Sequence, residues 1–322
     1  MPRILLFGAG SIGAAYIYLF SKGGAQVTAI CRSNYAAAKA KGFTINSTLW
    51  GDVHIQPEVV RTPSDASGPW DFVVVCSKAM PGTRPSTAET IRPAVGHNTA
   101  IVIIQNGIAV EEEYAALFPQ NPILSGVVYL PATQTAPAVI AHKEVELLYI
   151  GTFPAKAPET HKRSAMEFAA IIKAGGGTVE VHDDIQFQRY SKLLVNAAWN
   201  PTCALTRLRD AQFLKSSPSV IDFVRSVMLE VASIAQAVGY GKIDAELIEF
   251  QLSRAIARDL SGVEPSMLAD ALAGRAMEVE AIMGNTIRIA RKHGVKTPLL
   301  DGLYALAKAL DASLARERVE AN

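Results

Sequence analysis

The first thirteen residues of this chain constrain its fold more than any other segment. The apolar run Arg3–Phe7 has the composition of a buried strand, and a glycine-rich turn follows it directly. The turn has the pattern G-x-G-x-x-G and consists of Gly8, Ala9, Gly10, Ser11, Ile12 and Gly13. A helix-like segment, residues 14–21, comes next. A strand, this turn and a helix in that order predict the start of a β-α-β unit that binds a dinucleotide.

Each glycine of the turn has its own physical task in such a unit. The first permits a tight turn, the second lets the backbone approach a pyrophosphate, and the third lets the helix pack close to the strand. Free N–H groups and a partial positive charge at the N-terminus of the helix then bind the phosphates. A flexible turn that holds no ligand is the alternative, and the flanking strand and helix argue against it.

The residue after the second strand indicates which dinucleotide is bound. Residues 26–30 form that expected strand, and Arg32 stands where an NAD-preferring protein usually places a carboxylate. A carboxylate would repel a 2′-phosphate, whereas a guanidinium grips it with paired, charge-assisted hydrogen bonds. We therefore predict that the cofactor is NADP(H) and that Arg32 selects it. A solvated surface arginine is the alternative.

Bulk composition restricts the class of protein. The chain has 322 residues, of which 49% are apolar and 19% charged, and its net charge is +1. This length and apolar content predict two globular domains with sizeable cores. The small net charge argues against nucleic acid or a membrane surface as a partner, and no apolar run is long enough to span a bilayer. The histidines show no metal-ligand spacing, so we expect no metal site.

The cysteines and the N-terminus indicate a compartment. Cys31, Cys76 and Cys203 are scattered and odd in number, which fits reduced thiols better than a disulfide framework. The first core strand begins at Arg3, which leaves no room for a secretory signal. We therefore expect a cytoplasmic protein.

Secondary-structure patterns divide the chain into two parts. Up to residue 182, continuous Val and Ile runs alternate with helical stretches, which is typical of a doubly wound parallel sheet. The later strands are predicted at residues 72–75, 100–105, 124–129, 145–151 and 179–181, and helices at 87–92 and 160–174. A short edge hairpin is predicted within residues 42–60 and a loop at 138–144. Residues 1–182 are therefore predicted to form a Rossmann-type α/β domain.

Beyond Asp183 the strand pattern disappears, and residues 183–322 are predicted to form an all-α domain. Prolines and glycines mark where its helices begin and end. The predicted helical segments are residues 218–238, 265–294 and 299–314.

One helix at the start of this second domain carries the candidate chemistry. Residues 187–200 are largely apolar, yet Lys192, Asn196 and Asn200 recur at a spacing of four. Successive residues at this spacing are offset by only about 40° around a helix, so the three polar side chains form one stripe. A buried lysine needs partners, and burial lowers its pKa toward the range useful for proton transfer. An exposed polar stripe is the alternative. Pro201 is expected to kink or end the helix.

The order of these motifs resembles the ketopantoate reductase (2-dehydropantoate 2-reductase) family. The segment Lys192–Pro201 is similar to the family signature K-x-x-x-N-x-x-x-N-P. The glycine-rich turn and the arginine after the second strand precede it, as in the family, and the resemblance covers essentially the whole chain. Further motifs in family order are Ser77-Lys78, Gln105-Asn106-Gly107, and Ser266 to Asp270 followed by Glu278.

The resemblance implies NADPH-dependent reduction of a 2-oxo acid, ketopantoate to pantoate, in the biosynthesis of pantothenate and coenzyme A. It also implies a C-terminal domain of the 6-phosphogluconate dehydrogenase C-terminal-like type. By the same resemblance, Lys192 is the general acid, and Glu278 binds the substrate hydroxyl and helps hold Lys192. Lys78 is then a cation on the cofactor side. The residues that orient substrate and nicotinamide are Asn106, Asn196, Asn200 and Ser266.

Several of these residues also have a simpler interpretation. Asn106-Gly107 is an ordinary turn sequence, and Ser266 could cap the helix that follows it. Glu278 could lie at the edge of an apolar helix face, and Lys78 could be a solvated loop residue.

Two other functions stay open at the level of the whole protein. The same scaffold could reduce another 2-oxo acid or ketone, or the protein could sense NADP without turnover. A sensor would need neither Lys192 nor Glu278, so their presence favours an enzyme. A homodimer is compatible with the sequence, although no pattern in it specifies an interface.

Overall fold

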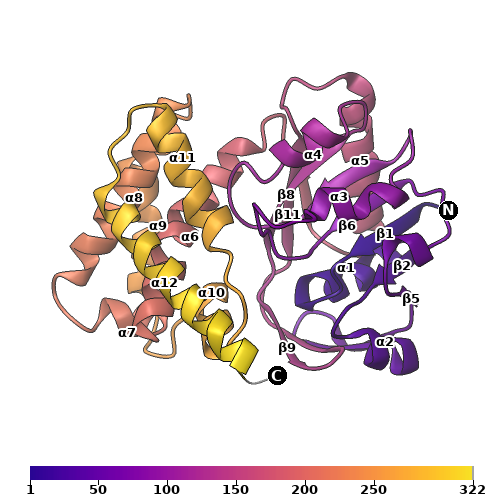
Figure 1. Ribbon diagram of the computed structural model, residues 1–322, viewed down its shortest axis with the longest axis horizontal. Helices are drawn as coiled ribbons and strands as arrows, with labels where there is room; N and C mark the ends of the chain where they lie inside the picture. The colour runs from indigo at the N-terminus through magenta and orange to yellow at the C-terminus, as the bar shows by residue number, and fades with distance from the viewer. Residues whose placement is uncertain (321–322) are drawn as a thin grey trace. The chain divides into compact units, whose positions relative to one another are not determined.

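The protein is described by a computed structural model over residues 1–320, and these fall into two compact units. The N-terminal unit comprises Met1–Gln105 and Val110–Gln186. The helical unit comprises Asn106–Ala109 and the chain from Phe187 onward (Figure 1). The short segment 106–109 thus belongs with helices that follow it by at least 77 positions in the sequence, an assignment that no local pattern predicts.

Within the described residues, an eight-stranded sheet forms the centre of the N-terminal unit, with the order β12-β11-β8-β7-β6-β1-β2-β5. Its strands are β1 (Arg3–Phe7), β2 (Gln26–Ile30), β5 (Glu58–Val60), β6 (Phe72–Val75), β7 (Ala100–Ile103), β8 (Ile123–Tyr129), β11 (Leu147–Thr152) and β12 (Val179–Val181). Neighbouring strands are parallel except β8 and β11. The prediction of a parallel sheet is wrong at that pair, because the chain between them forms strands and not the helical crossover that a parallel pair requires.

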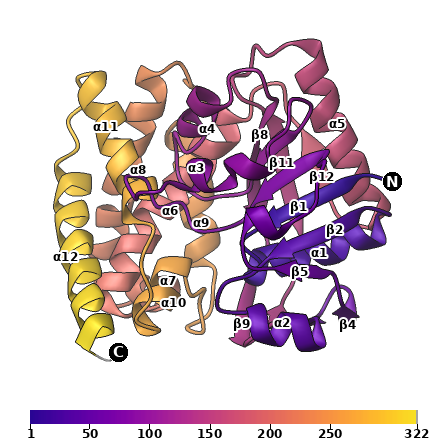
Figure 2. The same cartoon turned by 45° about the vertical axis from the view of Figure 1, so that its right-hand side comes forward.

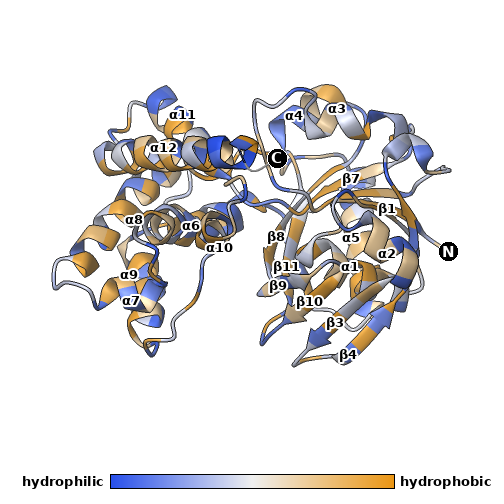
Figure 3. Cartoon of the chain, turned by 60° about the horizontal axis from the view of Figure 1, so that its bottom comes forward, coloured by the Kyte–Doolittle hydropathy of each residue, from blue (hydrophilic) through white to orange (hydrophobic). Residues whose placement is uncertain are grey.

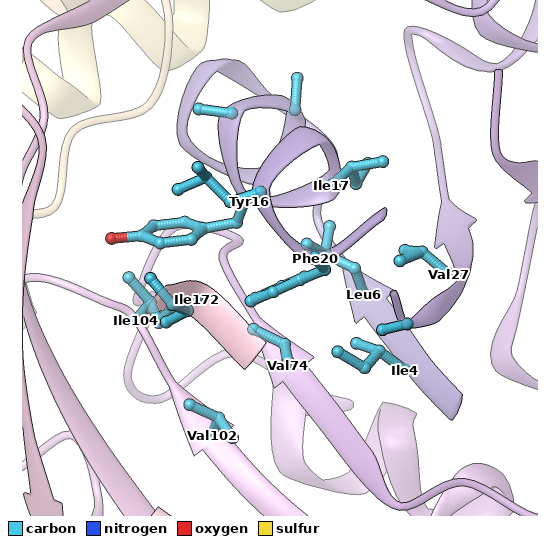
Figure 4. Packing of buried hydrophobic residues seen from close by; sticks show 14 of the residues in the cluster. Ile4, Leu6, Tyr16, Ile17, Phe20, Val27, Val74, Val102, Ile104 and Ile172 are labelled. Atoms are coloured by element: carbon cyan, nitrogen blue, oxygen red, sulfur yellow. The ribbon is translucent and has the colours of Figure 1, made fainter. Parts of the chain in front are cut away.

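Helices cover both faces of this sheet. α1 (Ser11–Lys22) and α5 (Glu159–Ala174) pack together on one face, and Figure 3 shows α3 (Thr87–Ile91) and α4 (Glu112–Leu117) on the other. β6 and β7 are buried along their whole lengths, as their continuous Val and Ile runs predict. Figure 4 shows Tyr16 and Phe20 of α1 packed over these strands. The doubly wound α/β fold predicted for the N-terminal part is therefore confirmed.

A second, four-stranded sheet with the order β4-β3-β10-β9 belongs to the same unit. Its strands are β3 (Phe43–Ser47), β4 (Gly51–Ile55), β9 (Ala132–Ala136) and β10 (Val139–His142). The predicted hairpin within residues 42–60 is present as β3 and β4. The predicted loop at 138–144 is wrong, because β10 pairs with β3. A four-residue strand is too short to show a period in sequence, and here its partner lies about ninety-five positions away.

The helical unit contains no strand within the described residues, as predicted. Its elements are α6 (Gln186–Thr206, whose first residue belongs to the other unit), α7 (Asp210–Leu214), α8 (Val220–Ala237), α9 (Ala245–Ile256), α10 (Ser266–Leu272), a π-helical turn (Glu280–Gly284), α11 (Asn285–Lys292) and α12 (Pro298–Glu320). α8 is the centre of the packing, because it contacts α9, α11 and α12. Figure 2 shows α12 as a long helix along one side of this unit.

Two helix predictions in this unit need correction. α6 does not end at Pro201 but runs on to Thr206. Pro201 has no N–H to donate to the carbonyl oxygen of Ala197, one turn earlier. The hydroxyl of the next residue, Thr202, donates to the carbonyl oxygen of Ala198. The helix predicted over 265–294 is interrupted between α10 and the π-helical turn, where Gly274 adopts φ +63°.

Candidate active site

The glycine-rich turn joins β1 to α1 with the tight geometry that its sequence predicts. Gly8 has a φ of +98°, and a Cβ on it would lie 2.4 Å from the backbone nitrogen of Ser77. A Cβ on Gly13 would lie 2.3 Å from the carbonyl oxygen of Gly8. Atoms that close would overlap, so only glycine fits at either position.

Gly10 lies in open space instead. A Cβ on it would meet no atom of the described residues within 4 Å, and its φ of −82° suits any residue. The protein's own packing therefore does not require glycine here, and the bare backbone leaves room for a ligand. Gly10 is the N-cap of α1, whose first turn begins with Ser11 and Ile12 and holds no acidic residue. The free N–H groups of that turn make the cradle fit the pyrophosphate of a dinucleotide.

Asn34 fixes the glycine-rich turn to the small sheet. It is 4% exposed, and its amide nitrogen donates to the carbonyl oxygen of Ala9 at 2.9 Å and to Oε1 of Gln134 at 2.8 Å. Its Oδ1 accepts from the backbone N–H of Ala138 at 3.3 Å. Because Gln134 lies in β9 and Ala138 directly precedes β10, the small sheet helps to hold the turn. No pattern in the sequence points to this role.

Arg32 lies just beyond β2 and is exposed to solvent, where a ligand can reach its guanidinium. A second arginine, Arg61, follows the neighbouring strand β5, and its guanidinium carbon lies 3.9 Å from the centre of the Tyr35 ring. β2 and β5 are parallel, with Ile30 opposite Val60. Both arginines therefore follow the carboxyl ends of adjacent strands, and only Arg32 could be singled out from the sequence because it occupies the known position after the second strand.

Lys78 follows β6, the strand next to β1, and is partly exposed. The carbonyl oxygen of the adjacent Ser77 accepts a hydrogen bond of 2.8 Å from Nε2 of Gln105, which follows β7. The carboxyl ends of β1, β6 and β7 therefore meet at one edge of the sheet, where ligands of open α/β sheets bind. The cofactor residues predicted in the N-terminal unit all lie at the carboxyl ends of β1, β2 and β6: Gly8, Ala9, Gly10, Ser11, Ile12, Gly13, Arg32 and Lys78.

In the helical unit, Lys192, Asn106 and Glu278 form one hydrogen-bonded group. The ammonium of Lys192 donates to Oδ1 of Asn106 at 2.9 Å. The amide nitrogen of Asn106 in turn donates to Oε2 of Glu278 at 3.5 Å, the long limit for such a bond. Asn106 thus bridges a cation and a carboxylate, and uses its acceptor for one and its donor for the other. Three residues from separate motifs, up to 172 positions apart, meet at this point.

The surroundings of Lys192 shift its pKa. Its pKa falls from 10.5 to about 8, mainly because burial disfavours the charged amine and also because Arg189 is positive. The carboxylate of Glu278, itself 8% exposed, opposes this shift. At neutral pH the amine is still mostly protonated, yet it releases its proton more readily than an exposed lysine. A group of this kind is suited to act as a general acid.

The turn that carries Asn106 is docked on the π-helical turn. Gly107 has a φ of +101°, and a Cβ on it would lie 2.3 Å from the carbonyl oxygen of Ala281. The backbone N–H of Ile108 donates to that same oxygen at 3.2 Å. Nδ2 of Asn285 donates to the carbonyl oxygen of Ile108 at 2.7 Å. Gly107 is therefore required by close packing as well as by turn geometry, and the sequence gives no sign of this partner.

The π-helical turn is itself braced by Glu280. Its carboxylate accepts from the Tyr304 hydroxyl at 2.6 Å and pairs with Arg288 at 3.0 Å and Lys308 at 3.1 Å. A Cβ on Gly284 would lie 2.3 Å from Oε2 of Glu280, so the small residue makes room for the carboxylate. Turns of π-helix are rare and occur often at functional sites, and this one begins two residues after Glu278.

A second polar contact joins Asn200 on α6 to Ser266 on α10. Oδ1 of Asn200, which is 2% exposed, accepts from the Ser266 hydroxyl at 3.2 Å and from the backbone N–H of Met267 at 3.1 Å. Ser266 is the first residue of α10, and the N-cap is Pro265. The alternative in which Ser266 only caps the helix therefore does not describe this structure, because its hydroxyl contacts Asn200.

The predicted residues of the helical unit thus form two groups along α6. Lys192 belongs to one and Asn200 to the other, eight positions later, which is about 12 Å along the helix axis. Asn196 lies between them on the same face and is partly exposed. Because Asn200 is buried, the alternative in which all three side chains form an exposed polar stripe is excluded.

Residues 1–320 contain no cluster of three or more His, Cys, Asp or Glu that could hold a metal ion. In the same part of the chain, no helix has the length and apolar character needed to cross a membrane.

Two models of one protein family match the chain. The model described as "Ketopantoate reductase PanE/ApbA" matches residues 4–155. The model described as "Ketopantoate reductase PanE/ApbA C terminal" matches residues 184–311. An uncharacterised protein from Saccharomyces cerevisiae is 31% identical, over 98% of this chain and 95% of its own length.

Solved structures share the fold over nearly their full lengths. A crystal structure of 2-dehydropantoate 2-reductase from Methylococcus capsulatus is 33% identical, with a TM-score of 0.84 and 97% of each chain covered. D-mandelate dehydrogenase, solved with NADH and anilino(oxo)acetate, is 22% identical with a TM-score of 0.85, over 97% of this chain and 99% of its own. A dimeric ketopantoate reductase from Staphylococcus aureus is 20% identical with a TM-score of 0.78 and the same coverage. The last two show likeness of fold alone.

Proposed function

Because this chain belongs to the ketopantoate reductase family, we propose that it reduces ketopantoate to pantoate with NADPH. The family supports the broader class, an oxidoreductase that acts on a CH–OH group. The single observation that carries the finer proposal is the Lys192–Asn106–Glu278 group, which puts a mostly buried proton donor at the lysine of the family motif.

The chemistry of ketone reduction explains why such a donor is needed. When bound, the nicotinamide supplies a hydride to the carbonyl carbon. Negative charge then develops on the carbonyl oxygen, and an ammonium aimed at that oxygen both stabilises the charge and donates a proton. Lys192 takes this role in our proposal. Asn106 holds its ammonium in place, and Glu278 accepts a hydrogen bond from the substrate hydroxyl.

The remaining polar residues of the helical unit orient the substrate in this proposal. Asn196 presents its amide one turn beyond Lys192, and Asn200 and Ser266 bind polar groups of the substrate further along α6. Asn106 also contacts the nicotinamide side. The buried position of Asn200 supports a fixed orientation, since its Oδ1 already accepts two hydrogen bonds.

We propose NADP(H) as the cofactor, held by the glycine-rich turn, Lys78 and Arg32. The open space at Gly10 supports a pyrophosphate there. Arg32 supports a 2′-phosphate, because a cation stands where NAD-preferring proteins carry a carboxylate. D-mandelate dehydrogenase was solved with NADH, and a comparison of NADPH and NADH in one binding titration tests the choice of NADP(H).

The division, assembly and location of the protein are also proposals. We propose domains at residues 1–182 for the dinucleotide and 183–322 for the substrate. A homodimer agrees with the dimeric Staphylococcus aureus enzyme, and a cytoplasmic location agrees with scattered cysteines. Light scattering of the purified protein tests the homodimer: a mass of one chain would contradict it.

The direct test of function follows the loss of NADPH absorbance with purified protein and ketopantoate, beside a panel of other 2-oxo acids. We expect rapid oxidation with ketopantoate and slow oxidation with the rest. Turnover confined to a different acid would contradict the substrate and keep the reaction class. NADPH binding without turnover of any acid would contradict the enzyme proposal and favour a sensor.

A further inference from the structure

Arg189 is a buried cation next to the candidate site, and none of the sequence motifs assigns it a role. It lies on α6 one turn before Lys192 and is 3% exposed. Its guanidinium donates to the carbonyl oxygen of Gly107 at 2.9 Å. A charged side chain is rarely buried this deeply unless its contacts offset the loss of hydration. The burial of Arg189 therefore indicates that its contact with Gly107 has a structural or functional role.

Arg189 is one of three residues whose contacts hold the backbone of the turn that carries Asn106. Arg189 binds the carbonyl of Gly107, while the carbonyl of Ala281 packs against the α-carbon side of the same glycine and Asn285 binds the next carbonyl. With the backbone held on these sides, the Asn106 side chain has little freedom. Its Oδ1 then stays 2.9 Å from the Lys192 ammonium.

Arg189 also acts on Lys192 through its charge. Residues three apart on a helix have their Cβ atoms about 5–6 Å apart, and a guanidinium keeps its proton at any working pH. The Arg189 guanidinium and the Lys192 ammonium contact adjacent residues of one turn, Gly107 and Asn106, and a like charge nearby disfavours the protonated form of the lysine. Of the charged groups that shift the pKa of Lys192, Arg189 on its own helix lowers it, and Glu278 in the segment before the π-helical turn raises it.

We propose that Arg189 is a positioning residue for the reduction, which fixes the Asn106–Gly107 turn against α6 and places a permanent positive charge one helical turn before Lys192. It acts through these two neighbours, and we assign it no contact with substrate. The expected effect of Arg189 on turnover rests on the proposed function. The expected effect of Arg189 on Lys192 does not.

The experiment measures the titration of Lys192 directly. The rate at which acetic anhydride acetylates Lys192 is followed from pH 6 to about 11 by mass spectrometry of the peptide, since only the neutral amine reacts. The variants are Arg189→Gln and Arg189→Met, which remove the charge, and Arg189→Lys, which keeps a cation. Arg225→Met is the matched control, because Arg225 is on α8 of the same unit and pairs with Asp222 and Glu249.

We expect the two neutral variants to raise the Lys192 midpoint by roughly one pH unit, and the high-pH fall of kcat to move by the same amount. Arg189→Lys keeps the midpoint near that of wild type but lowers kcat, because a single amine cannot reproduce the planar fork of the guanidinium. The control leaves both quantities unchanged. Two neutral replacements are used because one of them can unfold, and circular dichroism selects the folded ones.

An unchanged midpoint in a folded neutral variant would overturn the inference and leave Arg189 a structural residue. Asn285→Ala separates the two effects: it loosens the same turn without a change of charge, so kcat should fall while the midpoint stays. A shifted midpoint in a protein that does not reduce ketopantoate would support the inference and contradict the proposed function. The two failures are therefore distinguishable.

Discussion

Two glycine turns, one in each unit, have nearly the same positive φ and differ in what surrounds them. Gly8 has a φ of +98° and Gly107 a φ of +101°, and a Cβ on either would overlap backbone atoms. The first turn leads to Gly10, where bare backbone faces open space. The second is enclosed by Arg189, Ala281 and Asn285.

This difference shows two ways in which a tight turn serves a site. The open turn offers its own N–H groups to a ligand, so the absence of side chains is what matters. The enclosed turn offers a side chain, that of Asn106, and its backbone is fixed so that the amide stays between Lys192 and Glu278. Variants should therefore separate the two turns: one set should alter cofactor binding, and the other should alter proton transfer.

The largest effect is expected from Lys192→Ala in the enclosed site. Loss of a general acid typically costs about 10²–10⁴-fold in rate, so kcat should fall by that amount while NADPH binding stays within about twofold. Lys192→Arg should also be slow, because a guanidinium keeps the charge but does not release its proton. Lys292→Ala, at an exposed position on α11, is the control. Turnover at the wild-type rate in Lys192→Ala would refute its role.

The next effect is expected from Arg32→Asp beside the open turn. NADPH binding should weaken roughly 10–100-fold, since a charge-assisted pair is lost and a repulsive carboxylate is gained. NADH binding should stay equal or improve. Titration of nucleotide fluorescence gives both dissociation constants, and Arg163→Asp, an exposed position on α5, is the matched control. An unchanged NADPH/NADH ratio would contradict the assignment of Arg32.

Gly107→Ala should strain the enclosed turn. The residue has positive φ, and the new Cβ would collide with the carbonyl oxygen of Ala281, so unfolding free energy should fall by about 1–3 kcal/mol. A drop in kcat of about tenfold is expected for a misplaced Asn106, with NADPH binding retained. Urea denaturation and steady-state kinetics measure these quantities. A fully active and stable variant would show that the close approach is unimportant.

Gly10→Ala is the counterpart at the open turn and the smallest perturbation. Its φ suits alanine and no described atom obstructs the new methyl, so stability should stay within about 0.5 kcal/mol of wild type. NADPH binding should weaken about tenfold or less, because the methyl stands where the pyrophosphate approaches. A stable variant with unchanged binding would place the phosphates elsewhere.

The two turns also show which parts of the candidate site can be predicted from the sequence alone. The open turn is local: its strand, its three glycines and its helix follow one another, and Arg32, the proposed selector of the cofactor, comes directly after the next strand. The polar stripe of Lys192, Asn196 and Asn200 is likewise set by helix periodicity. These features were therefore predictable, as was the division into an α/β part and a helical part.

The enclosed turn depends on long-range packing, which leaves no local pattern. The partners of Gly107 lie on α6 and on a π-helical turn 174 positions later in the chain. A π-helical turn has no propensity signal of its own, and Arg189 looks like any helix residue until its burial is known. The same reason explains the missed strand β10, which exists because β3 pairs with it.

The most direct test of the account is the pH dependence of kcat for NADPH oxidation at saturating ketopantoate. In the proposed mechanism, reduction requires the protonated Lys192, whose pKa is lowered from 10.5 to about 8. The account predicts a constant rate below about pH 7 and a tenfold fall per pH unit above about 8, with the opposite trend for pantoate oxidation. A rate that stays level to about pH 10 would contradict it, because the proton would then come from a group other than a buried, depressed lysine.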